Sequence, residues 1–127
     1  EKEKVRYAGL LEWFENVAGY PSFNLLFLGL GEDGHTASLF PNRPGLLKTT
    51  EWVETVFHPQ SLQKRITLTG NVLRAAKEMI FLVTGSSKAR VVREIFSDDN
   101  AARFYPAWHL RPFRGKLTWL CVPEAAG

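Results

Sequence analysis

Apolar residues along this chain alternate between a helical spacing and short continuous runs. Residues 3–17 place apolar side chains three apart, which predicts an amphipathic helix. A glycine, a tyrosine, a proline and a serine at 19–22 predict the end of that helix. The apolar runs at 23–28 and 79–84 are typical of strands buried on both faces, as in a parallel sheet.

The rest of the chain continues this alternation of helices and strands. We expect further strands at 52–57, 65–69 and 117–122, and helices at 71–77 and after Gly85. The last of these helices places four apolar residues on one face: Ala89, Val92, Ile95 and Phe96. Helices that alternate with apolar strands favour an α/β fold with helices layered around a mainly parallel sheet. No repeat or linker divides the chain, so we expect one domain over residues 1–127.

A glycine-rich loop follows the first apolar run. Gly29 to Gly34 match G-x-G-x-x-G directly after a predicted strand, a pattern typical of dinucleotide-binding folds. That fold needs a crossover helix that opens at the third glycine. Only six residues separate Gly34 from Pro41, so a full crossover helix does not fit. We therefore expect a Rossmann-like fold without a dinucleotide site.

The same loop carries candidate catalytic residues. Ligands of open α/β sheets bind beyond the carboxyl ends of the strands, and glycines let a ligand approach the backbone closely. Asp33 and His35 flank Gly34 at this edge, and Gly31 lies two residues before Asp33. A purely structural reading stays open, in which Asp33 caps a turn and His35 packs or lies at the surface.

A second loop with the chemistry of an anion site follows the 79–84 run. Ser87 and Lys88 come just after Gly85, at the expected start of a helix. A lysine there is unfavourable by ~0.3–1 kcal/mol unless an anion shares the site, and a phosphate would remove that conflict. Arg65, before the alternation at 66–68, is a second candidate phosphate ligand. Solvent exposure of both cations is the alternative.

Composition and charge exclude several classes of protein. The chain is 45% hydrophobic and 23% charged, which is ordinary for a globular protein and unlike a disordered one. Its net charge is +3, but acidic residues are interspersed and no basic run exceeds two residues, which argues against nucleic acid. No stretch approaches the ~20 apolar residues of a membrane span. The lone cysteine, Cys121, suits a reducing compartment, and we expect the cytoplasm.

Residues 23–41, FNLLFLGLGEDGHTASLFP, resemble the signature of the bacterial 6-phosphogluconolactonases. The segments RITLT at 65–69, FLVTGSSKA at 81–89 and GKLTW at 115–119 agree with that family in order, so the resemblance covers nearly the whole chain. It implies hydrolysis of 6-phospho-D-glucono-1,5-lactone to 6-phosphogluconate, a step of the pentose phosphate pathway. It implies a small sugar-phosphate lactone as partner and no metal or cofactor. It leaves the oligomeric state open.

The resemblance also suggests a role for each candidate residue. His35 would act as general base on water and then as acid on the ring oxygen, and Asp33 would orient it. Lys88, with Arg65 in support, would bind the 6-phosphate, and Ser87, Gly31 and Gly34 would line the substrate site. Amides of the glycine loop would hold the developing oxyanion.

Two departures from family patterns affect this reading. The sister glucosamine-6-phosphate isomerases (deaminases) share the Asp-Gly-His but continue toward Asn-Glu-Pro, where this chain has Leu39-Phe40-Pro41. Phe40 cannot transfer a proton, which favours the lactonase. After the last strand, family members often have an aspartate, where this chain continues from Cys121 to Glu124.

The resemblance also implies that part of the family's site lies outside this chain. The family's N-terminal half carries a phosphate loop and an arginine that have no counterpart in these residues. We therefore expect the chain to be the C-terminal half of such a domain. The intact protein is expected to be active, and whether this part folds or works alone is left open.

Three alternatives remain at this point. One is an isomerase or deaminase acting on an amino-sugar phosphate, and another is a sugar-phosphate binding protein without turnover. A metal site built from Asp33, His35 and either His58 or His109 is the third, although the histidines do not have a familiar ligand spacing. Otherwise His58 and His109 are expected to be structural.

Overall fold

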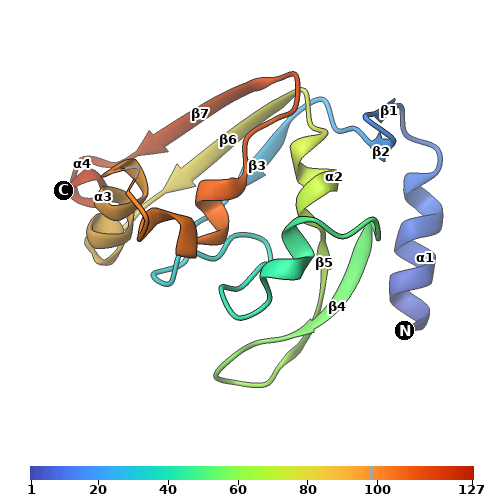
Figure 1. Ribbon diagram of the computed structural model, residues 1–127, viewed down its shortest axis with the longest axis horizontal. Helices are drawn as coiled ribbons and strands as arrows, with labels where there is room; N and C mark the ends of the chain where they lie inside the picture. The colour runs from blue at the N-terminus through green and yellow to red at the C-terminus, as the bar shows by residue number, and fades with distance from the viewer. Residues whose placement is uncertain (98) are drawn as a thin grey trace.

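The computed structural model describes residues 1–97 and 99–127, which form short helices and three small sheets (Figure 1). The helices are α1 (Lys2–Leu11), α2 (Gly70–Arg74), α3 (Ala89–Ser97) and α4 (Pro123–Ala126), with 3₁₀ turns η1 (Pro44–Leu47), η2 (Ser86–Lys88), η3 (Ala102–Phe104) and η4 (Pro106–His109). The strands are β1 (Asn16–Val17), β2 (Tyr20–Pro21), β3 (Leu26–Leu28), β4 (Val53–Phe57), β5 (Lys64–Leu68), β6 (Glu78–Val83) and β7 (Lys116–Cys121).

The main sheet is parallel and has the order β3-β6-β7. Its register pairs Leu28 with Phe81, and Phe81 with Trp119. In Figure 1 the arrowheads of β6 and β7 point toward the end of the sheet where α3 and α4 lie. The expected α/β fold with a mainly parallel sheet is therefore confirmed.

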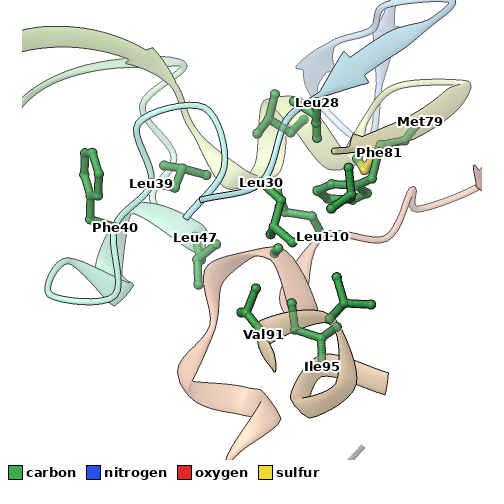
Figure 2. Close-up of a cluster of buried hydrophobic side chains, with 14 of the residues drawn as sticks. Leu28, Leu30, Leu39, Phe40, Leu47, Met79, Phe81, Val91, Ile95 and Leu110 are labelled. Carbon is green, nitrogen blue, oxygen red and sulfur yellow. The ribbon is translucent and has the colours of Figure 1, made fainter. Parts of the chain in front are cut away.

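The core lies on one face of this sheet. Met79, Phe81 and Val83 alternate along β6 and are all but inaccessible to solvent, as period-2 geometry requires for one buried face. Val91 and Ile95 of α3 pack against them, and Figure 2 shows these side chains converging below Met79 and Phe81. Burial of this apolar cluster fixes α3 over the sheet and so fixes the loops at its carboxyl end.

The opposite face of the sheet differs from the sequence prediction. Phe27 of β3 is 57% exposed, Leu82 of β6 45% and Leu120 of β7 53%, whereas the apolar runs predicted strands buried on both faces. The reason is that, in the described part of the chain, no helix packs over these side chains. The β3 strand is also shorter than the predicted 23–28, and ahead of it the Phe23 carbonyl accepts the Lys77 amide at 2.9 Å.

The N-terminal helix is shorter than the 3–17 spacing predicts. It ends at Leu11, and residues 16–17 pair with 20–21 in a hairpin that turns at Gly19, where φ is +86°. Leu11 is its only fully buried side chain, and Val5 is exposed, so little packing supports a longer helix. Lys4 joins α1 to β4 through an ion pair with Glu54 at 3.0 Å.

The remaining elements lie close to their predicted positions, with two corrections. The 71–77 segment forms a shorter helix, α2, which ends at Arg74. On α3, Val91, Val92 and Ile95 are buried but Phe96 is exposed, and it only meets Trp119 edge-on at a 5.2 Å centroid distance. None of the helices in the described ranges has the length and apolarity needed to cross a lipid bilayer.

Candidate active site

The two predicted loops meet at one edge of the main sheet. The glycine loop leaves β3 after Leu28, and residues 84–88 leave the neighbouring parallel strand β6, so both follow carboxyl ends of strands. Between β3 and η1 the chain forms turns and no α-helix, in agreement with the prediction that no crossover helix fits. Lys88 reaches across from η2 and donates a hydrogen bond to the carbonyl of Leu30.

His35 and Lys88 line the same hollow at this edge. Its volume is about 420 Å³, and its lining consists of Gly29, Leu30, Gly31, His35, Thr36, Ala37 and Lys88. The structure thus brings together a candidate base and a candidate phosphate ligand that lie 53 positions apart in the sequence. Ser87 is exposed on η2 beside Lys88 and does not belong to this lining.

Asp33 and His35 form a hydrogen-bonded pair. The His35 Nδ1 atom lies 2.5 Å from Asp33 Oδ1, and the same carboxylate oxygen accepts the His35 amide at 3.1 Å. A carboxylate can only accept, so Nδ1 carries the proton, and in the neutral imidazole Nε2 keeps its lone pair. Both side chains are partly exposed, at 27% for His35 and 47% for Asp33. The arrangement presents a fixed proton acceptor to solvent.

Gly31 leaves room for this pair. A methyl group on Gly31 would overlap Cε1 and Nδ1 of His35 and would lie 2.8 Å from Asp33 Oδ1. The amide of Gly31 donates to the His35 carbonyl at 2.9 Å, and the amide of Gly34 donates to the Gly31 carbonyl at 3.0 Å. These two amides are therefore already engaged within the loop, and the structure gives them a role in packing. Their contact with substrate stays a prediction.

Gly34 is fixed by Tyr105. Its φ is +78°, which favours glycine, and a methyl group there would overlap the Tyr105 ring. The Tyr105 hydroxyl donates to the Glu94 carboxylate on α3. This hydrogen bond lowers the pKa of Glu94 and, together with desolvation, raises the pKa of Tyr105. The sequence does not indicate this support, because nothing in the local pattern around 105 points to a contact with residue 34.

The buried ring of Phe40 packs against His35. It is 2% exposed, and the His35 ring packs on it at a 4.7 Å centroid distance. Arg65 of β5 lies over Phe40 at 6.0 Å and hydrogen-bonds Gln63 through its guanidinium. Arg65 is therefore near His35 but does not line the hollow that contains Lys88. The structure does not bring the two predicted phosphate ligands into one pocket.

A second hollow also includes His35 in its lining. It has a volume of about 270 Å³ and is lined by Glu32, Asp33, His35, His58, Pro59 and Gln60. His58 follows β4 on the β4–β5 hairpin, and its ring meets Phe40 edge-on at 5.2 Å. His109, the third histidine, instead bonds the Arg103 carbonyl at 2.7 Å. Across the described ranges, no three His, Cys, Asp or Glu side chains gather as a metal ligand set.

Comparisons with known proteins show which family this chain belongs to. The family model described as "Glucosamine-6-phosphate isomerases/6-phosphogluconolactonase" matches residues 1–119. The 6-phosphogluconolactonase of Synechocystis sp. is 40% identical over 117 residues, which are 91% of this chain and 48% of that protein.

Solved structures of similar proteins support the same family. The crystal structure of a devB protein has a TM-score of 0.92 at 34% identity, over 98% of this chain and 52% of that one. The 6-phosphogluconolactonase of Leishmania guyanensis has a TM-score of 0.81 at 29% identity, over 97% and 50% of the two chains. The chain thus spans about half the length of the proteins it matches. It belongs to the glucosamine-6-phosphate isomerase/6-phosphogluconolactonase family.

Proposed function

We propose that the protein hydrolyses 6-phospho-D-glucono-1,5-lactone to 6-phosphogluconate, as a carboxylic ester hydrolase of the pentose phosphate pathway. One observation carries the proposal: His35, whose Nδ1 lies 2.5 Å from Asp33 Oδ1, lines the same hollow as Lys88. A base and a cation in one hollow suit a substrate with a reactive ester at one end and a phosphate at the other. The 6-phosphogluconolactonases among the relatives support the same substrate.

The proposed chemistry uses neutral imidazole. His35 Nε2 takes a proton from water as the water oxygen attacks C1 of the lactone, and then gives that proton to the leaving ring oxygen. Asp33 holds the tautomer that leaves Nε2 free and stabilises the imidazolium between the two steps. A positioned acid–base group contributes about 10²–10⁴ in rate, which is sufficient for an ester that already opens readily. We therefore propose no metal or cofactor.

The proposed binding role belongs first to Lys88. Its ammonium fixes the 6-phosphate, which places C1 near His35 and converts binding energy into orientation. We propose that Arg65 and Ser87 assist from the edge of the site, that Gly31, which lines the hollow, contacts the substrate, and that Gly34 supports this contact from outside the lining. Of the two cations, Arg65 is less well placed than Lys88 to bind the phosphate, because its guanidinium already contacts Gln63 and the Phe40 ring.

The proposal extends to the intact protein and its surroundings. We propose that this chain forms the C-terminal portion of a single lactonase domain, in keeping with the half of each relative that it spans. The proposed compartment is the cytoplasm, where a partly buried thiol such as Cys121 stays reduced. Neither nucleic acid nor membrane has a role in the proposed reaction.

A deaminase acting on glucosamine 6-phosphate is the second candidate, since the matching family includes such enzymes. Phe40 argues against it. The residue occupies the position where the resemblance implies a reacting glutamate, and it is buried between two imidazoles with no group that can carry a proton.

The test is His35→Ala in the full-length protein, assayed for lactone opening above the spontaneous rate. His109→Ala is the matched control, because it removes a histidine outside both hollows. We expect the first variant to lose at least about 10²-fold in kcat and the second to keep its rate. Full activity in a folded His35→Ala variant would remove the proposed base. Ammonia release from glucosamine 6-phosphate by the wild type would favour the deaminase, and binding of 6-phosphogluconate without turnover would favour a binding protein.

A further inference from the structure

The residues of the β4–β5 loop that line the second hollow take no part in the proposed acid–base chemistry. This hollow is lined by polar groups of the glycine loop and by the loop that joins β4 to β5, and it shares His35 with the hollow that contains Lys88. Because His35 lines both hollows, the C1 end of a ligand that is anchored by its phosphate at Lys88 and reacts at His35 lies next to this second space. Groups that face that space are therefore candidates to contact the oxygen atoms on C1.

His58 is held there in a single tautomer. Its Nδ1 atom accepts two backbone amides, from Gln60 at 3.2 Å and from Ser61 at 3.1 Å. An imidazole nitrogen that accepts cannot carry the proton, so the proton is on Nε2. The Phe40 ring, edge-on at 5.2 Å, restricts rotation of the imidazole. In the described part of the chain, no residue pairs with the Nε2–H of His58.

The two imidazoles on Phe40 are complementary. His35 offers an unprotonated Nε2, because its Nδ1–H is directed to Asp33, whereas His58 offers Nε2–H. One can take a proton from water, and the other can donate a hydrogen bond without transferring its proton. Both line the second hollow, so a carbonyl carbon attacked beside His35 has a donor nearby for its oxygen.

The glycine loop offers fewer donors for that oxygen than its sequence suggests. The amides of Gly31 and Gly34 are bonded to carbonyls within the loop. Glu32 and Asp33 add negative charge to the same hollow, which would oppose a developing oxyanion. A fixed N–H donor is therefore needed where the charge forms.

We infer that His58 binds the C1 oxygen of the substrate, as the hydrogen-bond donor to the oxyanion and then to the carboxylate of the product. This role rests on the proposed lactonase function. The water oxygen bonds to C1, the bond from C1 to the ring oxygen breaks, and His35 carries one water proton to that ring oxygen. The second water proton leaves to solvent when the product acid ionises. His58 keeps its own proton throughout.

Two variants in the full-length protein test the role of His58. Asn in His58→Asn can still accept the amides of residues 60 and 61, so the loop is kept while the Nε2–H is lost. Phe in His58→Phe keeps the edge contact with Phe40 and loses both nitrogens. Removal of one oxyanion donor typically costs about 10²–10³ in kcat, and we expect a loss of at least about 10-fold in both variants. An unchanged kcat in a folded His58→Asn variant would overturn the inference.

A binding experiment separates this inference from the proposed function. Calorimetry compares 6-phosphogluconate with glucitol 6-phosphate, which has the same phosphate but a hydroxymethyl group in place of the C1 carboxylate. We expect His58→Asn to weaken binding of the first ligand about 10-fold and to leave the second unchanged. If the wild type does not open the lactone but His58→Asn still selectively weakens binding of 6-phosphogluconate, the proposed function fails and the C1 contact stands. Equal affinities of wild type and variant for both ligands would refute the contact, whatever the activity.

Discussion

The ring of Tyr105 occupies the space that a side chain on Gly34 would need. A methyl group on Gly34 would overlap Tyr105 Cδ1 and lie 2.6 Å from Tyr105 Cβ. The Gly34 carbonyl also accepts the Ala107 amide at 3.1 Å. The segment between Asp33 and His35 is thus held against the chain around η4, so the geometry of the candidate base depends on a residue 71 positions away.

Gly34→Ala should therefore impair both stability and activity. A left-handed conformation costs alanine roughly 1–2 kcal/mol, and the overlap with Tyr105 adds about 1–3 kcal/mol of overpacking. Urea unfolding should show a loss of at least about 2 kcal/mol in the free energy of unfolding, with lactone opening strongly reduced. Gly45→Ala is the control, because a methyl group on Gly45 meets nothing within 4 Å. Equal stability of the two variants would contradict the packing argument.

Gly31→Ala should impair activity more than stability. Its methyl group would overlap the His35 ring and displace the Asp33–His35 pair, but both side chains are partly exposed and can move into solvent. We expect kcat to fall about 10²-fold, since the base is lost from its position, while the melting temperature changes little. Gly9→Ala, on α1 outside both hollows and with nothing within 4 Å of the added methyl group, should keep its activity. A Gly31→Ala variant with wild-type kcat would show that the pair tolerates displacement.

Asp33→Asn tests the orientation of the candidate base. An amide can donate to His35 Nδ1, which stabilises the tautomer with its proton on Nε2 and removes the acceptor that water needs. We expect kcat to drop by roughly 10²–10⁴ with KM little changed. Asp99→Asn is matched, because Asp99 also accepts a backbone amide in a turn, that of Ala101 at 2.9 Å, but lies outside both hollows. A selective rise in KM would instead point to Asp33 as a ligand for a sugar hydroxyl.

Lys88→Met tests phosphate binding. The methionine keeps much of the apolar stem but loses the ammonium that contacts the Leu30 carbonyl. If the lysine only binds, steady-state kinetics should show KM raised at least about 10-fold with a smaller effect on kcat. Lys48→Met removes an exposed lysine outside the hollow and should leave KM unchanged. A Lys88→Met variant with the wild-type KM would exclude the phosphate role.

Local patterns in the sequence identify most strands and the site's loops but not the exposed face of the sheet. The runs around Phe27 and Leu82 are as apolar as those of a strand covered on both sides, because sequence hydrophobicity does not record which neighbours are present. The spacing of apolar residues also predicts a first helix longer than the one the structure has. Its threefold spacing continues past Leu11, but the chain turns into the β1–β2 hairpin instead.

In the candidate site, too, the sequence predicts some contacts and not others. Asp33 and His35 are two positions apart, so their pairing follows from the loop itself, and Lys88 joins them because β3 and β6 are adjacent parallel strands. The approach of His58 and Tyr105 depends on tertiary packing, of the β4–β5 hairpin and of the chain around η4. No periodicity or motif in their own segments indicates that they lie beside the glycine loop.

The Tyr105–Glu94 hydrogen bond makes the stability of the fold depend on pH in the acidic range. The Tyr105 hydroxyl, then Arg90 at 2.9 Å, lower the pKa of the Glu94 carboxyl below its ordinary value of 4.5. A carboxyl with a lowered folded-state pKa stabilises the fold above its unfolded pKa, and this contribution is lost as the pH falls through the folded value. Tyr105→Phe keeps the ring against Gly34 but removes the main donor.

Urea unfolding from pH 7 to pH 3 should therefore show wild type more stable than Tyr105→Phe at neutral pH, with the gap closing below about pH 4.5 as Glu94 becomes protonated. Tyr7→Phe serves as the control, and its difference from wild type should not vary with pH, since no acidic partner bonds the Tyr7 hydroxyl in the described residues. If the gap for Tyr105→Phe stayed constant down to pH 3, the hydroxyl would stabilise the fold independently of the Glu94 charge. The retained ring should also keep Gly34 in place, so lactone opening at pH 7 by this variant should remain close to that of wild type.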